Sequence, residues 1–509
     1  MLTALAIYTP EEFQEAIKDK KPIKIRIALF YDGTMNHRKN IEEREANSDI
    51  YHKMRVKDGP NSYDNGRTNI AIMEPHVSKE KADYAGDYDL VYKHYIAGQG
   101  PIKHKKDSVW GYALAIGESG VPRRAEEGID YAVNSILKED DKIINPLDHY
   151  IEKLTIDVFG FSRGAATARY AIHVILNGKL SSFDDDTGHV SYDFDPVVNR
   201  LSDFYVVKNN AVEVGFAGLY DTVLSYIGSQ LLPWTSNTLQ QTAVSRAKKA
   251  LHLAAADEHR SDFSLHKIKS AVDSGIGEEY YLPGVHSDIG GSYNKANEIT
   301  LKNETDESKK QYMLTSNEGM PDACRSMIDA LAYTGLVLHE GGEYDRATLD
   351  QDRADLIAQG WYKPDEINVV VSSWTEGQPS GYELRVKRHG IRSAYCNIPL
   401  KIMAEYARKP DVKLKISAEL EDRTNKILES EPDLQKLEGI IRDYMASHKT
   451  NSRPGHWIDD NAPLNNAALK QIRHKHFHFS SKPGIGYSPR FEWDDAARKF
   501  RRKRYYYNA

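Results

Sequence analysis

Residues 154–178 of the chain read LTIDVFGFSRGAATARYAIHVILNG. The first seven form an apolar run that predicts a buried strand, and the apolar spacing from Arg163 onward predicts a helix that Gly178 would end. The G-x-S-x-G pattern GFSRG, residues 160–164, lies on the turn between them. A serine on such a turn projects its hydroxyl outward, and the free N–H groups at the helix start favour a developing oxyanion. Ser162 is therefore the candidate nucleophile, and the alternative is a structural serine that caps the helix.

Apolar runs on either side of this stretch predict the rest of a sheet. Ile23–Phe30, Val212–Leu219 and Tyr280–Val285 have the composition of strands, and Arg123–Lys138 has the spacing of a helix. Strands that alternate with helices predict a mostly parallel sheet with helices on both faces. We therefore expect an α/β-hydrolase-like fold, with polar and helical insertions in the C-terminal half.

The character of the chain changes after about residue 296. We expect a catalytic core over residues 1–296 and a polar insertion, lid or cap over residues 297–390. Residues 391–509 should form a C-terminal helical segment that packs on the core and ends in a basic tail. The basic run Arg498–Arg504 reads as a solvated tail, and the alternative is attraction to anionic lipid or another polyanion.

The composition excludes several classes of protein. The 509 residues carry a net charge of −6, which argues against a strongly basic nucleic-acid-binding protein. Two cysteines, Cys324 and Cys396, cannot build a disulfide scaffold or a four-thiolate zinc site, and we expect two buried thiols. No spacing of ligands suggests a metal, and no cofactor is expected. The N-terminus lacks a basic segment and no apolar run reaches 18 residues, so we expect synthesis in the cytoplasm without a signal peptide.

A serine hydroxyl attacks an ester only with the help of a base and a carboxylate that orients the base. Asp221 follows the apolar run that ends at Leu219, and His286 follows the run that ends at Val285. In α/β hydrolases the acid and the base follow the serine in this order, each on a loop after a strand. The reserve acids are Asp257 and Asp288, the competing histidines are His252 and His259 in a predicted helix, and Asp157 is expected to be a buried, hydrogen-bonded carboxylate.

The oxyanion hole needs backbone donors. One is the N–H of Arg163, directly after the serine, and a second should come from the loop after an early strand. Gly33 and Thr34 occupy that loop, where the alternative is an ordinary turn built on Asp32-Gly33. The apolar segment Val223–Trp234 follows the acid and would suit an acyl groove or an interfacial lid, with an ordinary buried helix or loop as the alternative.

Further motifs resemble one family of α/β hydrolases, an uncharacterised-domain family from bacteria and fungi that includes the first class of type VI secretion lipase effectors. The motifs span most of the chain in the order of the family: FYDGTMN (30–36), GRTNIA (66–71), YIAGQG (95–100), GFSRGAATAR (160–169), GLYDTV (218–223), DEHRSDF (257–263), PGVHSDIGGSY (283–293), CNIPLKIM (396–403) and HFHFS (476–480). The family's triad comes from the elbow, DTV and GVHSD motifs, which implies Ser162, Asp221 and His286. Tyr220 stands where the family often has tryptophan.

The resemblance implies a phospholipase A-type serine hydrolase that cleaves membrane glycerophospholipids as an antibacterial effector. It implies export by type VI machinery on a spike protein, action at the periplasm or membrane of a target cell, and an immunity protein that neutralises the enzyme. One alternative is a carboxylesterase or deacylase of small or carbohydrate esters. The other is a binding protein on a retired hydrolase fold, against which the three intact triad residues argue. Binding to nucleic acid is not expected.

Overall fold

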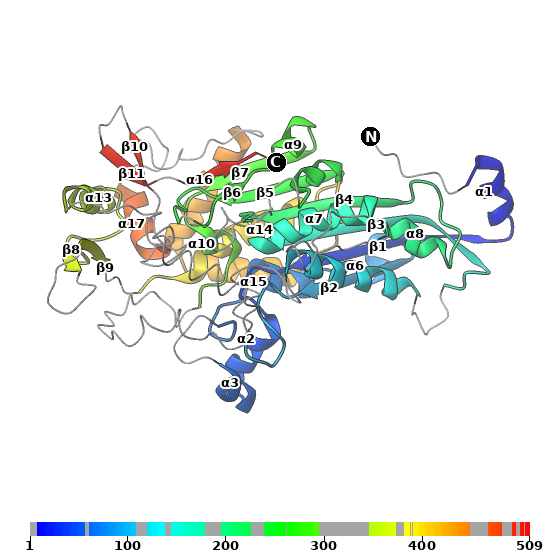
Figure 1. Cartoon of the computed structure of the whole chain (residues 1–509), viewed down its shortest axis with the longest axis horizontal. Coiled ribbons are helices and arrows are strands. Elements are labelled where there is room, and N and C mark those ends of the chain that lie inside the picture. Colours follow the sequence, from blue (N-terminus) through cyan, green and yellow to red (C-terminus); the bar gives the residue numbers. More distant parts are fainter. Residues whose placement is uncertain are drawn as a thin grey trace, which may run out of the picture.

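The computed structural model describes residues 8–55, 61–107, 120–137, 144–178, 195–224, 239–260, 262–294, 346–372, 381–386, 388, 390–447, 467–480, 491–494, 499–502 and 504–508. A six-stranded sheet lies at the centre, in the order β2-β1-β3-β4-β5-β7, and every neighbouring pair is parallel (Figure 1). Its strands are β1 (Lys21–Tyr31), β2 (Leu90–Ile96), β3 (His149–Phe161), β4 (Val212–Tyr220), β5 (Lys249–Ala255) and β7 (Gly277–Leu282).

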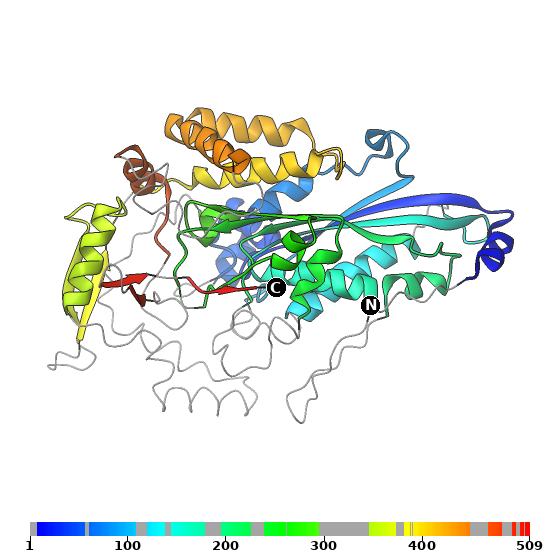
Figure 2. The same cartoon turned by 90° about the horizontal axis from the view of Figure 1, so that it is seen from above.

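Helices cover both faces of the sheet (Figure 2). One face carries α6 (Val121–Leu137), α7 (Arg163–Asn177), α8 (Val197–Ser202), α9 (Lys269–Asp273) and the 3₁₀ helix η3 (Gln241–Arg246). The other carries α4 (Asn69–His76), α14 (Asn397–Arg408), α15 (Ala418–Glu429) and α16 (Pro432–Ser447). The other helices described before residue 295 are α1 (Pro10–Ile17), α2 (Arg38–Glu45), α3 (Asp49–Met54), η1 (Lys81–Tyr84) and α10 (His286–Gly290). This arrangement confirms the predicted α/β-hydrolase-like fold.

Strand β3 shows how the sequence builds this layered core. Side chains alternate between the two faces of a strand, so Ile156 and Val158 pack under α6 and α7 while Phe159 packs on the opposite face. There the Phe159 ring stacks on Phe30 of β1, with 4.6 Å between the ring centroids. Both faces are covered, so the strand reads as a nearly continuous apolar run.

Asp157 is the exception in that run. It is fully buried and accepts a 2.7 Å hydrogen bond from Nε of Arg26 on β1. The expectation of a buried, hydrogen-bonded carboxylate is confirmed.

One predicted helix is wrong. The stretch AKKALHLAAADEHR, residues 247–260, was expected to be helical, but residues 249–255 form strand β5 between β4 and β7, and His252 lies on that strand. Alanine and leucine favour helices, but that preference is weak, and packing between two strands overrides it here. The sequence also gave no signal for β2, an edge strand whose central residues are only partly buried.

The C-terminal half adds smaller elements: α13 (Arg346–Ala358), β8 (Ile367–Ser372), β9 (Gly381–Val386), η6 (Ser393–Cys396), α17 (Ala467–His476), β10 (Phe491–Asp494), β11 (Lys499–Arg502) and β12 (Tyr506–Tyr507). Strands β8–β9 and β10–β11 are antiparallel pairs, and β12 pairs in parallel with β6 (Leu265–His266). Figures 1 and 2 show α13, β8, β9, β10 and β11 on the side where the strands of the sheet end. Among the described residues, no helix is both long and apolar enough to cross a bilayer.

Candidate active site

Ser162 lies on the turn between β3 and α7. Its backbone has φ 59° and ψ −129°, a left-handed conformation that costs a non-glycine residue about 1–3 kcal/mol. This geometry is typical of a nucleophile elbow, where a sharp turn exposes the serine hydroxyl. The Ser162 side chain makes no hydrogen bond to the described first turn of α7, so it does not act as the helix cap of the alternative interpretation.

Two glycines allow the elbow to form. A Cβ at Gly160 would lie 2.5 Å from the Cα of Ala165 in α7. A Cβ at Gly164 would lie 2.2 Å from the carbonyl oxygen of Asp32, directly after β1. Both contacts are with backbone, which cannot rotate away. The start of α7 therefore sits against the end of β1, and this brings the residue after the serine next to the loop expected to supply the second oxyanion donor.

The acid and the base meet at the same edge of the sheet. Asp221 directly follows β4, and His286 begins α10 after β7. The His286 Nδ1 and the Asp221 Oδ2 are 2.5 Å apart, and both side chains are buried. The imidazole contacts the rings of Phe161 and Phe263, with centroid distances of 4.6 and 5.0 Å. Phe161 immediately precedes Ser162, and the Ser162 N–H donates to the carbonyl oxygen of Tyr220, directly before Asp221, at 3.0 Å. The turn that carries Ser162 therefore lies beside the Asp221–His286 pair.

The charge states of this pair suit a base and its orienting acid. Burial alone would raise the pKa of Asp221, but the charge of Arg504 and the hydrogen bond from His286 outweigh it and hold that pKa well below its usual range. Burial lowers the pKa of His286 from 6.5, and its bond to Asp221 offsets only part of this effect. At neutral pH the carboxylate is therefore ionised and the imidazole is neutral, with its Nδ1–H donated to Asp221.

In the part of the chain that the structure describes, no hydrogen bond joins the Ser162 hydroxyl to His286. Catalytic hydrogen bonds are often long without substrate and shorten in the substrate complex.

Neither reserve acid contacts the His286 ring. Asp257 Oδ2 accepts the Gly284 N–H at 2.7 Å. Asp288 pairs with the ring of His478, at 2.7 Å between Oδ1 and Nδ1. Both carboxylates therefore shape the loop that presents His286 rather than serve it chemically.

A third carboxylate, Glu258, was not predicted to belong to the site. It is buried, and its Oε2 accepts the backbone N–H of His286 at 3.1 Å. The same carboxylate binds the guanidinium of Arg260 through two 2.9 Å hydrogen bonds and accepts the hydroxyl of Ser480 at 3.0 Å. The DEHRSDF and HFHFS motifs thus meet behind the histidine, although nothing in their sequences alone indicates the contact.

The competing histidines have other partners. His252 in β5 bonds Glu279 through Nδ1 at 2.9 Å, and its Nε2 accepts the N–H of Thr222 at 3.1 Å. It thereby fixes the residue that follows Asp221. His259 bonds the Asp257 carbonyl oxygen through Nδ1 at 2.9 Å.

The two expected donors after β1 differ. The Gly33 N–H donates to Asp32 Oδ1 at 2.7 Å, so it is engaged within its own turn. The Thr34 N–H has no acceptor among the described residues. Arg163 Nε donates to Thr34 Oγ1 at 2.7 Å, which ties the loop to the residue after the nucleophile. Thr34 and Arg163 are therefore better placed than Gly33 to supply oxyanion donors.

Asp32 holds this loop in place through hydrogen bonds to its carboxylate. Besides Gly33, it accepts the hydroxyls of Tyr95 at 2.6 Å and Thr68 at 2.7 Å. Burial raises the pKa of Asp32 to about 6, because these three hydrogen bonds offset only part of the cost of desolvating the carboxylate.

The basic tail departs from its prediction. Arg504 is 3% exposed and forms a bidentate pair with Asp221, with its NH1 2.6 Å from Oδ1 and its NH2 2.8 Å from Oδ2. The interpretation of this end of the run as a solvated tail is wrong for Arg504. The pairing joins residues 283 positions apart, and no local pattern could have revealed it.

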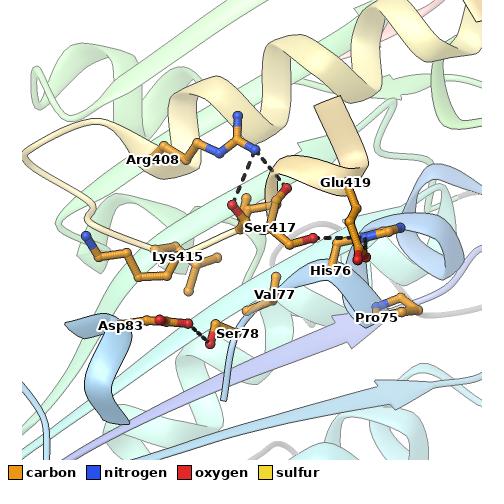
Figure 3. Close-up of a pocket in the computed structure, with 11 residues that line it drawn as sticks. Pro75, His76, Val77, Ser78, Asp83, Arg408, Lys415, Ser417 and Glu419 are labelled. Atoms are coloured by element: carbon orange, nitrogen blue, oxygen red, sulfur yellow. Dashed lines mark hydrogen bonds and ion pairs between the residues drawn. The ribbon is translucent and has the colours of Figure 1, made fainter. Parts of the chain in front are cut away.

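A hollow of about 590 Å³ lies elsewhere, where the end of α4 faces the turn between α14 and α15 (Figure 3). Arg408 and Lys415 line it together with Asp83 and Glu419, so its walls carry both signs of charge. Ser162, Asp221 and His286 are absent from its lining.

Several expectations fall outside the described residues. These are residues 297–345 of the insertion predicted over residues 297–390, with Cys324, and residues 225–234 of the groove or lid predicted over Val223–Trp234. Cys396 is a free, half-buried thiol whose pKa burial raises to about 12. Within the ranges given above, no group of three or more His, Cys, Asp or Glu side chains could hold a metal ion.

Comparison with known proteins gives one family and one fold. The family model described as "T6SS, Phospholipase effector Tle1-like, catalytic domain" matches residues 25–315. A solved structure of the Tle1 effector bound to the VgrG spike from the type 6 secretion system aligns with 96% of this chain and 94% of its own, at a TM-score of 0.52 and 18% identity. An uncharacterised protein from Pseudomonas aeruginosa aligns with 96% and 83%, at a TM-score of 0.37 and 14% identity. No curated protein matches.

Proposed function

The chain belongs to the family of Tle1-like phospholipase effectors of type VI secretion, and on this premise we propose that it is a serine acyl hydrolase of the phospholipase A type. Ser162 would be the nucleophile, His286 the general base and Asp221 the orienting acid. The observation that carries the proposal is the buried 2.5 Å contact between His286 and Asp221 beside the strained elbow of Ser162.

The reaction follows from these positions. His286 Nε2 takes the Ser162 proton as Oγ attacks the ester carbonyl, and Asp221 stabilises the imidazolium that forms. The N–H groups of Arg163 and Thr34 receive the oxyanion. The protonated imidazole then gives its proton to the leaving lysophospholipid alkoxide. Water, deprotonated by His286, releases the fatty acid from the acyl-enzyme and restores the serine.

The proposed substrate is membrane glycerophospholipid, and the proposed carrier is a secretion spike. Support for the carrier comes from the Tle1 effector of similar fold, whose structure was determined on the VgrG spike. Under this proposal the enzyme leaves the producing cell by type VI machinery and acts on the membrane of a target cell. In the producing cell an immunity protein neutralises it.

Fatty-acid release from phospholipid vesicles by the wild type and by Ser162→Ala tests the proposal. A short-chain soluble ester runs alongside. The wild type should release fatty acid, and the variant should lose at least about a thousandfold in kcat. Cleavage of the soluble ester alone would instead favour the carboxylesterase alternative, and full activity of the variant would remove Ser162 from the mechanism.

A further inference from the structure

We propose that Arg504, in the C-terminal tail, is a positioning residue for the catalytic acid, so that the last residues of the chain complete the active site. The inference rests on the proposed function, because it assigns Asp221 as the acid. Arg504 lies far beyond residues 25–315, the part matched by the family's catalytic domain. A segment outside that domain would therefore supply one of the groups on which the reaction depends.

The guanidinium and the carboxylate fit each other closely. NH1 donates to Oδ1 at 2.6 Å and NH2 donates to Oδ2 at 2.8 Å, the parallel arrangement that makes arginine–carboxylate pairs directional. The Ala255 N–H also donates to Oδ1 at 2.8 Å, and His286 bonds Oδ2. Each carboxylate oxygen thus has two partners, and rotation of the Asp221 carboxylate would break several hydrogen bonds at once.

The backbone holds Arg504 in place from both sides. Its Nε donates to the Phe263 carbonyl at 2.7 Å, and NH1 donates to the Ala255 carbonyl at 3.0 Å. Immediately afterwards, β12 pairs with β6, and the N–H of Leu265 donates to the Tyr505 carbonyl at 2.8 Å. Figures 1 and 2 both show the C-terminus beside the strands from β5 to β7. Arg504 therefore lies just before a paired strand, which fixes its backbone.

The charge of Arg504 acts on His286 through Asp221. The buried guanidinium keeps Asp221 ionised and neutralises part of the carboxylate's negative charge. Asp221 therefore stabilises the protonated form of His286 less strongly than an unpaired carboxylate would. Among the described residues, Glu258 and Arg260, which bind each other, also act on His286, and His266 and Tyr281 interact with Arg504. Tyr506 lies close to Arg504. Loss of the Arg504 charge would therefore make protonation of His286 more favourable.

A purely structural role would be to anchor the tail, and the chain offers a matched control for it. Arg502, two residues earlier, also makes a bidentate pair, with Asp352 of α13 at 2.9 and 2.5 Å. That pair lies on the same tail and has the same chemistry, but it does not touch the triad. Arg502→Gln therefore weakens the tail anchor without removing a partner of Asp221, whereas Arg504→Gln removes both.

The experiment compares full-length Arg504→Gln, Arg504→Lys, Arg502→Gln and Ser162→Ala with the wild type. It measures kcat and KM on a soluble ester from pH 5 to 9, and thermal unfolding. Arg504→Gln should lower kcat up to about a hundredfold with KM nearly unchanged, because the catalytic acid is less well positioned. It should also move the acid limb of kcat/KM upward by about one pH unit, since a nearby cation has been removed. Arg504→Lys should keep the wild-type pH midpoint but lower kcat about tenfold, because lysine keeps the positive charge and loses the bidentate hydrogen bonding of the guanidinium.

Two outcomes would overturn the inference. One is that Arg504→Gln matches Arg502→Gln in both kcat and pH midpoint, which would make Arg504 only an anchor. The other concerns the case in which Arg504→Gln does not fold. The test then rests on Arg504→Lys, and a wild-type kcat of Arg504→Lys would refute the positioning role. Should Ser162→Ala keep its activity, the proposed function itself fails. If Ser162→Ala is inactive but Arg504→Gln has the same kcat and pH midpoint as Arg502→Gln, only the inference about Arg504 is refuted.

Discussion

Gly164→Ala perturbs the contact between the start of α7 and the end of β1. The added Cβ would lie 2.2 Å from the Asp32 carbonyl oxygen and 2.4 Å from the Tyr31 carbonyl oxygen. Non-bonded carbon contacts are comfortable at about 3.5 Å, so helix and loop must separate by about 1 Å. This separation moves the N–H of Arg163 away from Thr34. Because a misplacement of about 1 Å costs roughly a hundredfold in rate, kcat/KM should fall by about two orders of magnitude.

Overpacking should also cost Gly164→Ala about 1–3 kcal/mol in the free energy of unfolding, so activity must be compared at equal folded fraction. Circular dichroism gives that fraction, and a soluble ester gives kcat/KM. Gly439→Ala in α16 is the control, since a Cβ there meets nothing within 4 Å. It should keep full activity and gain about 0.5–1 kcal/mol. If folded Gly164→Ala retained more than about a third of wild-type kcat/KM, the close approach of α7 and β1 would not be what aligns the oxyanion donors.

Three further predictions follow from the buried charges. Because burial lowers the pKa of His286, kcat/KM should rise with pH along an acid limb whose midpoint lies below 6.5, and a midpoint above 7 would contradict this environment. Arg26→Met strands the buried Asp157 carboxylate and should cost about 3–5 kcal/mol in urea unfolding, with kcat per folded molecule unchanged; an equally stable variant would show that the pair adds nothing. Arg504 and Arg260 lower the folded-state pKa values of Asp221 and Glu258, although burial alone would raise them. The two ionised carboxylates therefore stabilise the folded state above their unfolded pKa values of 3.8 and 4.5, and this stabilisation is lost as the pH falls below those values. The Tm should therefore drop steeply below about pH 4.5, with a shallower slope for Asp221→Asn, and equal slopes would contradict this assignment.

The sequence predicts those parts of the fold whose pattern is local. Buried parallel strands are short apolar runs, and β1, β3, β4 and β7 were expected within a few residues of their observed bounds. The chemistry follows the same rule, because in this architecture the reactive side chains stand directly after strands. Ser162, Asp221 and His286 could be chosen on that basis, and the structure pairs Asp221 with His286 beside the turn that carries Ser162.

The remaining features depend on contacts between distant segments. β5 is rich in alanine and leucine and looks helical until it is packed between two strands. The choice between Gly33 and Thr34 depends on a hydrogen bond to Asp32 inside one turn. In the sequence, Arg504 cannot be distinguished from the other residues of its basic run. In the fold, the pairing of β12 with β6 holds it buried against Asp221. No spacing or composition in the sequence carries this information.

The proposal that Ser162 is the nucleophile can be tested with a fluorophosphonate that reacts with activated serines. Wild-type protein should take up one equivalent of label, and mass spectrometry of the digested protein should place it on Ser162. Ser162→Ala should remain unlabelled, and His286→Ala should react at least about a thousandfold more slowly because the hydroxyl has lost its base. Labelling of another serine, or lipid hydrolysis by a wild type that takes up no label, would contradict the proposed mechanism.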